Sequence, residues 1–398
     1  MSTPTLPDIS VPEVLAGAYA HGPGKAVQPG AAPPYPHRAG PATPLGAALA
    51  GYGERGTRLR QVLTAALAPR RFEPWNPFND HRAYPSPRAA HLVDVALWLG
   101  GRRWAVDPVR GLLRAIAATG SVGADGPPTA DWAMVELAGH PHRMPSGYGR
   151  LAEALAVLEA GHVAGALTEA AAGYGLTATS RTAAAGLTVS FGGSTPPTWP
   201  RRRLRAVRSS GLGPCGFGAD PRPLPGAVLT DLVDAAYRIP AGSPGAWPGL
   251  RHTVAVGNVT GREPGWYRAE PGGPVAAAAP AAALDQLQRA YTYPRSQTDV
   301  AGLPLAWLIT ADIAAAVRAG GAEAYPRLLY AAGACAQHLA TAAGAAGLFC
   351  RPVRAVREVV VEAAATVPAG HDLVYLLLIG RSRVRDFAYD LDDPEVPL

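Results

Sequence analysis

The chain has few cysteines, and their spacing excludes two kinds of site. Cys215, Cys335 and Cys350 are the only three in 398 residues, and no two of them form a Cys-x-x-Cys pair. We therefore expect neither a disulfide framework nor a cysteine zinc site, and a reducing cytoplasm fits the chain. Gly-x-Ser-x-Gly, P-loop and His-Glu-x-x-His motifs are also missing. Hydrolase and nucleoside-triphosphatase activities thus have no support in the sequence.

Long apolar runs are missing as well. The longest, Leu373–Ile379, is far too short to cross a bilayer, and the N-terminus lacks the basic and apolar regions of a signal peptide. We therefore expect no membrane partner and a cytoplasmic location. Aromatic residues make up 7% of the chain and charged residues 17%, against 48% hydrophobic residues. Such a composition predicts a core of Ala, Leu and Val in closely packed helices.

Positive charge is in slight excess, and nearly all of it comes from arginine. The formal net charge of +6 is compatible with nucleic acid, an acidic peptide or a phosphorylated cofactor as a partner. Five arginines fall within residues 201–208, but no aromatic residues are interleaved with them. We therefore expect no nucleic-acid partner. Electrostatic docking of an acidic peptide or partner protein is the hypothesis for this run.

A repeated helical phrase divides the chain into two similar halves. Residues 161–176 read GHVAGALTEAAAGYGL and residues 333–348 read GACAQHLATAAGAAGL, with seven of sixteen positions identical without gaps. A repeat at this distance indicates two similar domains rather than a solenoid. Stretches rich in Pro and Gly mark the boundaries. We expect an extended arm over 1–44, a first domain over 45–193, a linker over 194–204 and a second domain over 205–398.

Both halves are expected to follow one α+β plan of helix, loop, hairpin, long helices and strand. For the first half, the patterns predict helical segments over 45–69, a hairpin over 91–108, helices over 130–143 and 147–175, and a strand ending at Gly193. For the second half, they predict a helix over 225–237, a hairpin over 251–271, helices over 280–291 and 311–347, and strands over 357–364 and 373–380. The last strand is apolar on both faces, which is typical of a central strand.

Several phrases, in order along the chain, resemble flavin-dependent proteins of the nitroreductase fold. They are PSPRAAHLVDVAL (85–97), YGR (148–150), LEAGHVAGAL (158–167), NVTGREPGWYRAEP (258–271) and LLLIGRSR (376–383). The chain looks like the azoline dehydrogenases, which aromatise thiazolines and oxazolines in ribosomally made peptides. The resemblance covers roughly 80–193 and 205–385. It implies a nitroreductase-like α+β fold in two tandem copies that form an internal pseudo-dimer.

The resemblance also implies FMN, because this family binds flavin between two subunits. One subunit supplies an Arg-x-Ser and a Gly-Arg for the phosphate, and the other covers the ring with a Pro-Ser loop. The matching residues here are Arg208, Ser210, Gly380 and Arg381 for the phosphate, and Pro85, Ser86 and Arg88 for the ring. The reciprocal site lacks its Arg-x-Ser and its final arginine, so we expect one flavin per chain. No metal site is expected.

The family's lysine, taken as its catalytic base, is missing, because Gly147 stands in its place. Desaturation requires removal of a carbon-bound proton as hydride leaves for the flavin. Tyr148 could accept that proton if Arg150 lowered its pKa, and His162 could substitute for it. A core role for Tyr148 and a structural role for His162 stay open.

Three functions remain open. The first is an FMN-dependent dehydrogenase that converts a peptide-derived azoline to an azole, with a modified peptide as substrate and a cyclodehydratase or other pathway enzyme as partner. The second is a degenerate partner or scaffold without flavin, or a repurposed enzyme. The third is a small-molecule nitro or flavin reductase that uses NAD(P)H. The pseudo-dimer could be monomeric or dimerise further.

Overall fold

The computed structural model describes ten stretches of the chain, which are residues 41–79, 81–116, 132–183, 186–197, 209–213, 216–237, 249–276, 282–365, 367–383 and 388–391. The arm predicted over 1–44 lies almost wholly outside these residues. So do Arg208, the arginine run and most of the predicted linker.

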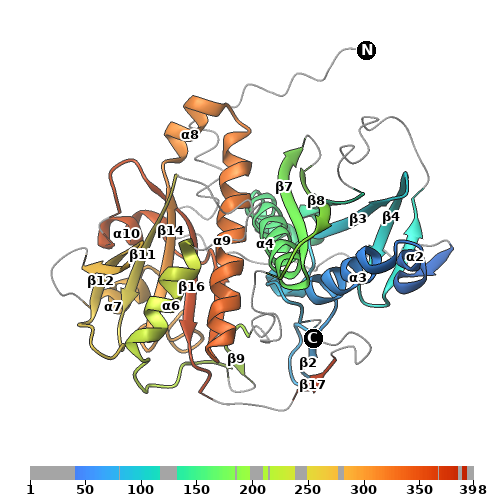
Figure 1. The fold of residues 1–398 in the computed structure, drawn as a ribbon. Helices are drawn as coiled ribbons and strands as arrows, with labels where there is room; N and C mark the ends of the chain where they lie inside the picture. Colours follow the sequence, from blue (N-terminus) through green and yellow to red (C-terminus); the bar gives the residue numbers. More distant parts are fainter. Residues whose placement is uncertain are drawn as a thin grey trace.

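Two antiparallel sheets flank a central pair of long helices (Figure 1). The first sheet has the order β1 (Ala42–Pro44), β5 (Leu112–Ala115), β4 (Arg102–Asp107), β3 (Val93–Leu99), β6 (Ala133–Gly139), β8 (Gly186–Ser194) and β7 (Leu176–Ala183). The second has the order β13 (Gly273–Ala276), β12 (Gly265–Glu270), β11 (Leu250–Val256), β14 (Leu305–Ala311), β16 (Asp372–Gly380) and β15 (Phe349–Val353).

Helices pack on both sheets. The first half contains α2 (Leu45–Ala50), α3 (Gly53–Leu67) and α4 (Leu151–Tyr174), and the second contains α6 (Gly226–Tyr237), α7 (Ala283–Ala290), α8 (Ile313–Gly320), α9 (Ala324–Ala345) and α10 (Glu358–Ala364). Two small sheets pair β9 (Leu212–Gly213) with β10 (Gly216–Phe217) and β2 (Arg71–Phe72) with β17 (Tyr389–Asp390). Through β17 the second half returns to the first (Figure 1).

The two halves repeat one topology. The strands β5-β4-β3-β6-β8-β7 match β13-β12-β11-β14-β16-β15 in spatial order, and the matching strands follow one another in the same chain order. In each half the long helix, α4 or α9, connects the same two strands. The prediction of an α+β fold in two tandem copies is therefore confirmed.

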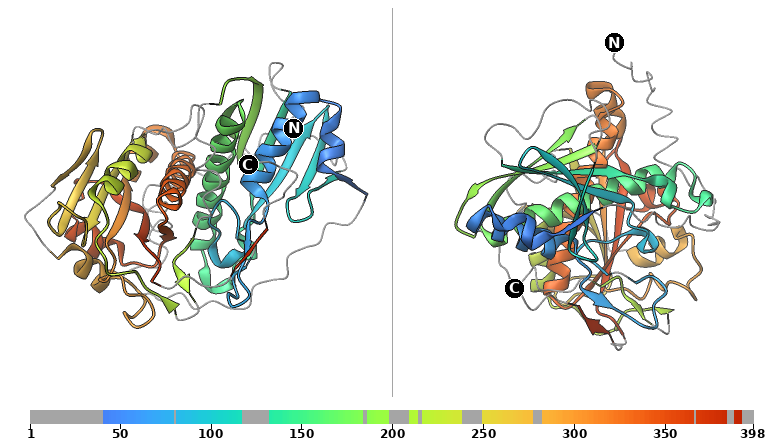
Figure 2. Two further views of the ribbon diagram at one scale, coloured as in Figure 1. Left: turned by 60° about the horizontal axis from the view of Figure 1, so that its bottom comes forward. Right: turned by 90° about the vertical axis from the view of Figure 1, so that its right-hand side faces the viewer.

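The repeated phrase forms the contact between the copies. Gly161 and Gly333 are equivalent in the repeat and meet each other, and so do Glu169 and Thr341, whose side chains are 2.8 Å apart. Because equivalent residues meet at both places, α4 and α9 run side by side in the same direction. Figure 2 (left) shows this pair between the two sheets.

The interface of α4 and α9 leaves no room for side chains where the helices are closest. A Cβ at Gly161 would overlap the carbonyl oxygen of Tyr330, and a Cβ at Gly333 would overlap that of Leu158. Tyr330 and Leu158 are themselves equivalent in the repeat. The two glycines therefore let the backbones touch symmetrically, as isologous interfaces require.

Helix α4 is apolar around its whole circumference, which is typical of a helix buried on all sides. Among the described residues it is the one helix long and apolar enough to cross a membrane, but 83% of its apolar window is buried inside the protein. Its composition is thus explained by its place between α9, α3 and the first sheet.

Two predicted elements are wrong in type. The segment 130–143 was expected to be a helix, but it contains β6, which lies between β3 and β8. Glu136 is the one polar residue among the seven of this strand, so the sequence has no polar alternation to distinguish it from a helix. The segment 357–364 was expected to be a strand, but it forms α10. There Val361 is buried while Val359 and Val360 are exposed, a one-sided pattern that suits a helix.

Other differences concern extent. The helix predicted over 311–347 is two helices, because α8 ends at Gly320 and the following Gly321 has a φ of 67°. Strands β7, β14 and β15 were not predicted. The other predicted helices and both hairpins are confirmed within a few residues at their ends.

Replacing Gly161 by Ala should destabilise the protein, although alanine is the better helix former. The added Cβ would push α4 away from α9, and overpacking of this kind costs about 1–3 kcal/mol. Urea unfolding should show a lower midpoint with an unchanged slope.

Gly46→Ala in α2 is the matched control, because its Cβ would meet only the flexible Arg60 side chain at 3.4 Å. It should leave the midpoint unchanged or raise it. Equal effects of the two substitutions would contradict the packing role of Gly161.

Candidate functional site

A cavity of about 450 Å³ lies where the two copies meet. Such a volume lies within the usual range of small-molecule sites. The first copy contributes the loop that precedes β3 together with one face of α4, and the second contributes the loop after α7, the strand β15 and one residue of β16. The lining side chains that carry the argument below are Arg82, Pro85, Ser86, Arg88, Tyr148, Glu159, His162, Ser210, Tyr291, Tyr293, Arg351, Arg354 and Tyr375.

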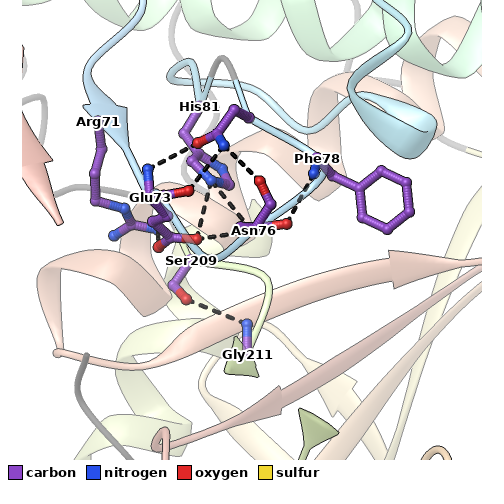
Figure 3. A network of polar contacts seen from close by, with 8 residues as sticks. Arg71, Glu73, Asn76, Phe78, His81, Ser209 and Gly211 are labelled. Carbon is purple, nitrogen blue, oxygen red and sulfur yellow. Dashed lines mark hydrogen bonds and ion pairs between the residues drawn. The ribbon is translucent and has the colours of Figure 1, made fainter. Parts of the chain in front are cut away.

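A polar network fixes one wall of this cavity (Figure 3). The Glu73 carboxylate accepts hydrogen bonds from Asn76 at 2.7 Å and from the Arg71 guanidinium at 2.8 Å, and it contacts His81 at 3.0 Å. Burial raises the pKa of Glu73, but the hydrogen bonds from His81 and Asn76 and the Arg71 charge outweigh it and leave the pKa below its usual value. The network thereby holds the loop that carries Phe78 along the cavity.

The Pro85–His91 loop is strained. Arg88, Ala89 and His91 have φ values of 54°, 52° and 46°, a left-handed conformation that non-glycine residues rarely adopt. The Ser86 hydroxyl holds the loop in two directions, accepting from the His91 N–H and donating to the Glu159 carboxylate, both at 2.8 Å. Strain of this kind persists where the surroundings impose it, and it often marks a ligand site.

Glu159 is a buried acid that faces the cavity. Its side chain is hydrogen-bonded to Ser86, and only 1% of the residue is exposed. Burial raises the pKa of Glu159 to about 7, against the lowering effects of the Ser86 hydrogen bond and the Arg82 charge. A carboxyl group with such a pKa can both accept and release a proton near neutral pH.

His162 lies one turn further along α4 and also lines the cavity. Its Nε2 atom is 3.3 Å from the Tyr375 hydroxyl, and its Nδ1 atom is 3.3 Å from the amide oxygen of Gln337. Glu159 and His162 belong to the first copy, whereas Tyr375 and Gln337 belong to the second. The groups that can handle protons are therefore assembled across the interface.

Among the residues that the structure describes, four arginines line the cavity, namely Arg82, Arg88, Arg351 and Arg354. Arg354 is buried and donates to the Val374 carbonyl at 2.8 Å. Arg351 lies near Ser210, because the Cys350 amide donates to the Ser209 carbonyl at 2.9 Å and ties the segment 209–213 to β15. Guanidinium and hydroxyl donors of this kind suit a phosphate group.

The structure brings six of the predicted site residues to the cavity: Pro85, Ser86, Arg88, Tyr148, His162 and Ser210. Arg150 is exposed at the start of α4 and does not line it. Gly380 and Arg381 at the end of β16 also lie outside the lining. The backbone of Gly380 packs closely on Phe349 and Pro304, which accounts for a glycine there. Arg208 lies outside the described residues.

Sequence reasoning missed Arg82, Glu159, Arg351, Arg354 and Tyr375. Glu159 carried a usable signal, since it is one of three acidic residues, with Glu153 and Glu169, in a helix that is otherwise mostly apolar. Arg351 lies in β15 and Arg354 follows it directly, and that strand was itself not predicted. Tyr375 is one aromatic residue within an apolar strand, where nothing in the sequence distinguishes it from a core residue.

The two proton-handling residues of α4 have no polar counterpart in α9. Ala331 stands where the first copy has Glu159, and Ala334 stands where it has His162. Thr179 of the first copy is the uncharged equivalent of Arg351. At these three positions the acid–base and arginine side chains are thus present at only one of the two symmetry-related places.

Comparison with known proteins places the fold. No protein-family model matches the sequence, and no curated protein matches it. Among solved structures, a candidate nitroreductase from Anabaena variabilis has a TM-score of 0.68 at 14% identity, and the alignment covers 88% of this chain and 93% of that one.

Two further structures match one copy only. One is a candidate nitroreductase from Ralstonia eutropha, with a TM-score of 0.35 at 20% identity over 46% of this chain and 83% of that one. The other is the microcin synthetase complex McbBCD from E. coli with truncated pro-MccB17 bound, with a TM-score of 0.36 at 16% identity over 45% of this chain and 71% of that one. Both scores are too low to support an argument. The first match extends over both halves, and the chain has the nitroreductase fold.

Stability should depend on pH through Glu159. Its pKa in the folded protein, about 7, lies above its usual value of 4.5. The stability it contributes is therefore fully present below pH 4.5 and lost as pH rises through 7, a loss of about 3 kcal/mol. Glu159→Gln keeps an acceptor for Ser86 and cannot ionise, so the variant should become more stable than the wild type as pH rises.

Urea unfolding near pH 4.5 and near pH 8 checks this expectation. Glu270→Gln is the control, because this side chain at the end of β12 is half-exposed, and the variant should follow the wild type. Parallel pH profiles for Glu159→Gln and the wild type would contradict the role given to burial.

Proposed function

We propose that the chain is an FMN-dependent oxidoreductase that binds one flavin in the cavity between its two copies. The observation that carries the proposal is the composition of that cavity, which has phosphate-binding donors and proton-handling groups from both copies of a nitroreductase fold. Arg351 and Ser210 come from the second copy, and Glu159 and His162 come from the first. Alanines stand at the places equivalent to Glu159 and His162, which supports one flavin per chain.

The donor set fits FMN. Arg351 and Ser210 would hold the phosphate, with Arg208 as the further predicted donor. The flat ring would lie among apolar and aromatic side chains, which include Leu151, Leu155, Leu212, Tyr291 and Val353. An apolar crevice with a few polar contacts is the usual environment of such a ring. Ser86 and the strained loop around it would cover the ring, as the Pro-Ser loop does in the family that the sequence resembles.

The specific reaction that we propose for this oxidoreductase is the oxidation of a peptide-derived azoline to an azole. Bound FMN supplies a two-electron acceptor that can take a hydride. The reaction then needs a protein group that takes a proton from carbon, and Glu159 and His162 occupy the cavity although the family lysine is missing. Tyr148 stays a candidate, because it lines the same cavity. A modified peptide and a pathway enzyme are the proposed partners, in the cytoplasm.

A scaffold without flavin is the second candidate. One observation favours it, namely that the Ser86 hydroxyl already donates to Glu159 and accepts from His91. Donors that are engaged inside the protein are less available to a ligand. This candidate predicts a colourless protein that still binds a peptide or a pathway enzyme.

Freshly purified protein should carry flavin at about one FMN per chain. The measurement is the visible absorption spectrum together with the flavin released by heat. Absence of flavin after reconstitution with excess FMN would rule out the redox function and leave the scaffold. Two FMN per chain would contradict the asymmetry of the cavity.

Arg351→Gln should weaken FMN binding by about 10- to 100-fold, because one hydrogen bond to a charged group contributes about 1.5–3 kcal/mol. Titration of the flavin-free protein with FMN, followed by fluorescence, gives the affinity. Arg268→Gln, on β12 and paired with Glu270 on the surface, is the control. Equal affinities for the two variants would place the phosphate elsewhere.

A further inference from the structure

We propose that Tyr375 and His162 form the acid–base pair of this site, with Tyr375 as the group that meets the substrate. The inference rests on the proposed function and adds to it a catalytic residue on the second copy. Tyr375 and His162 both line the cavity, and the Tyr375 hydroxyl is 3.3 Å from His162 Nε2. Their rings meet edge to face at 5.7 Å.

The orientation of the Gln337 amide decides which nitrogen of His162 carries the proton. The Gln337 Nε2 group donates to the Ala83 carbonyl at 3.0 Å and to the Thr341 hydroxyl at 3.2 Å. Its oxygen therefore points toward His162 Nδ1, at 3.3 Å. An amide oxygen can only accept, so Nδ1 must carry the hydrogen.

This tautomer leaves the Nε2 lone pair of the neutral His162 directed at the Tyr375 hydroxyl. Nε2 must then accept from Tyr375, which makes the phenol the proton donor within the pair. As the imidazole takes the phenol proton, negative charge develops on the phenol oxygen. That oxygen thereby becomes a stronger base toward the proton of the substrate carbon. Gln337 thus acts as a positioning residue, and the arrangement matches the usual one in which a third group orients the base.

The hydrogen bonds continue to a buried carboxyl group. Thr341 donates to the Glu169 carboxyl at 2.8 Å, and the other oxygen of Glu169 lies 2.7 Å from His338 Nδ1. Every donor from Tyr375 through His162, Gln337 and Thr341 points the same way, toward Glu169. Successive hydrogen bonds that point in one direction polarise each other, which makes His162 Nε2 a better acceptor of the Tyr375 proton.

In the proposed step the substrate loses one proton and one hydride. The substrate carbon gives its proton to the Tyr375 oxygen while the Tyr375 proton moves to His162 Nε2. The electron pair of that carbon–hydrogen bond forms the new ring double bond, and the neighbouring carbon loses a hydride to the oxidant, a bound flavin. The substrate loses one proton and one hydride, His162 gains the proton, and the flavin gains the hydride.

The test of the pair is ¹⁵N NMR of the histidine side chains in the flavin-free full-length protein near neutral pH. The signal lost in His162→Gln identifies the residue. We expect the Nδ1–H tautomer, a shift of the Nε2 signal in Tyr375→Phe, and a mixture of tautomers in Gln337→Leu. Tyr267→Phe is the control. This buried tyrosine lies in β12, away from the cavity, and donates to the carbonyl of Glu263 in the loop before that strand. An Nε2–H tautomer, or equal shifts in the two tyrosine variants, would overturn the proposal.

The rate gives the second readout. With FMN bound, Tyr375→Phe should slow flavin reduction by a peptide carrying one thiazoline by about 100-fold or more, the usual loss for a general acid–base group. Flavin content should stay at the wild-type level in this variant. A wild-type rate in Tyr375→Phe would overturn the acid–base pair. Failure of the wild-type protein to bind flavin would instead reject the proposed function, and the NMR result alone would then decide whether His162 and Tyr375 are paired.

Discussion

The parallel contact between α4 and α9 determines how the two copies and their sheets are placed relative to each other. The backbones of the two helices touch at Gly161 and Gly333. Each glycine lies against the carbonyl of the residue three positions before the other glycine, Tyr330 for Gly161 and Leu158 for Gly333. Since each helix also packs on the sheet of its own copy, this contact fixes the distance between the two copies. The cavity is lined by residues of both copies, which this contact holds together.

The interface combines symmetric backbone packing with asymmetric side chains. The backbone follows the repeat, as the matched strand orders show. The buried polar residues do not, because Ala331 and Ala334 of α9 stand at the positions equivalent to Glu159 and His162 of α4. Glu169 and His338, the other buried acid and histidine of the two helices, lie 2.7 Å apart and pair with each other.

The sequence was informative where local chemistry decides the structure. The repeated helical phrase and the hairpin pattern of 91–108 predicted features that the structure contains, and the doubled α+β plan was right. It failed where a nearly continuous apolar run lacks periodicity, as in β6, and where β-branched residues form a one-sided helix, as in α10. Strand β15 went unpredicted, and with it Arg351. The pairing of His162 with Tyr375 joins residues 213 positions apart, and only the sheet and helix packing brings them together.

The central claim is that one ligand contacts both copies at once. Hydrogen exchange of the backbone, followed by mass spectrometry with and without FMN, tests it directly. We expect FMN to slow exchange in the Pro85–His91 loop of the first copy and in the residues from Arg351 to Ala355 of the second. Protection confined to one copy, or no protection in either segment at saturating FMN, would contradict a flavin site shared between the two.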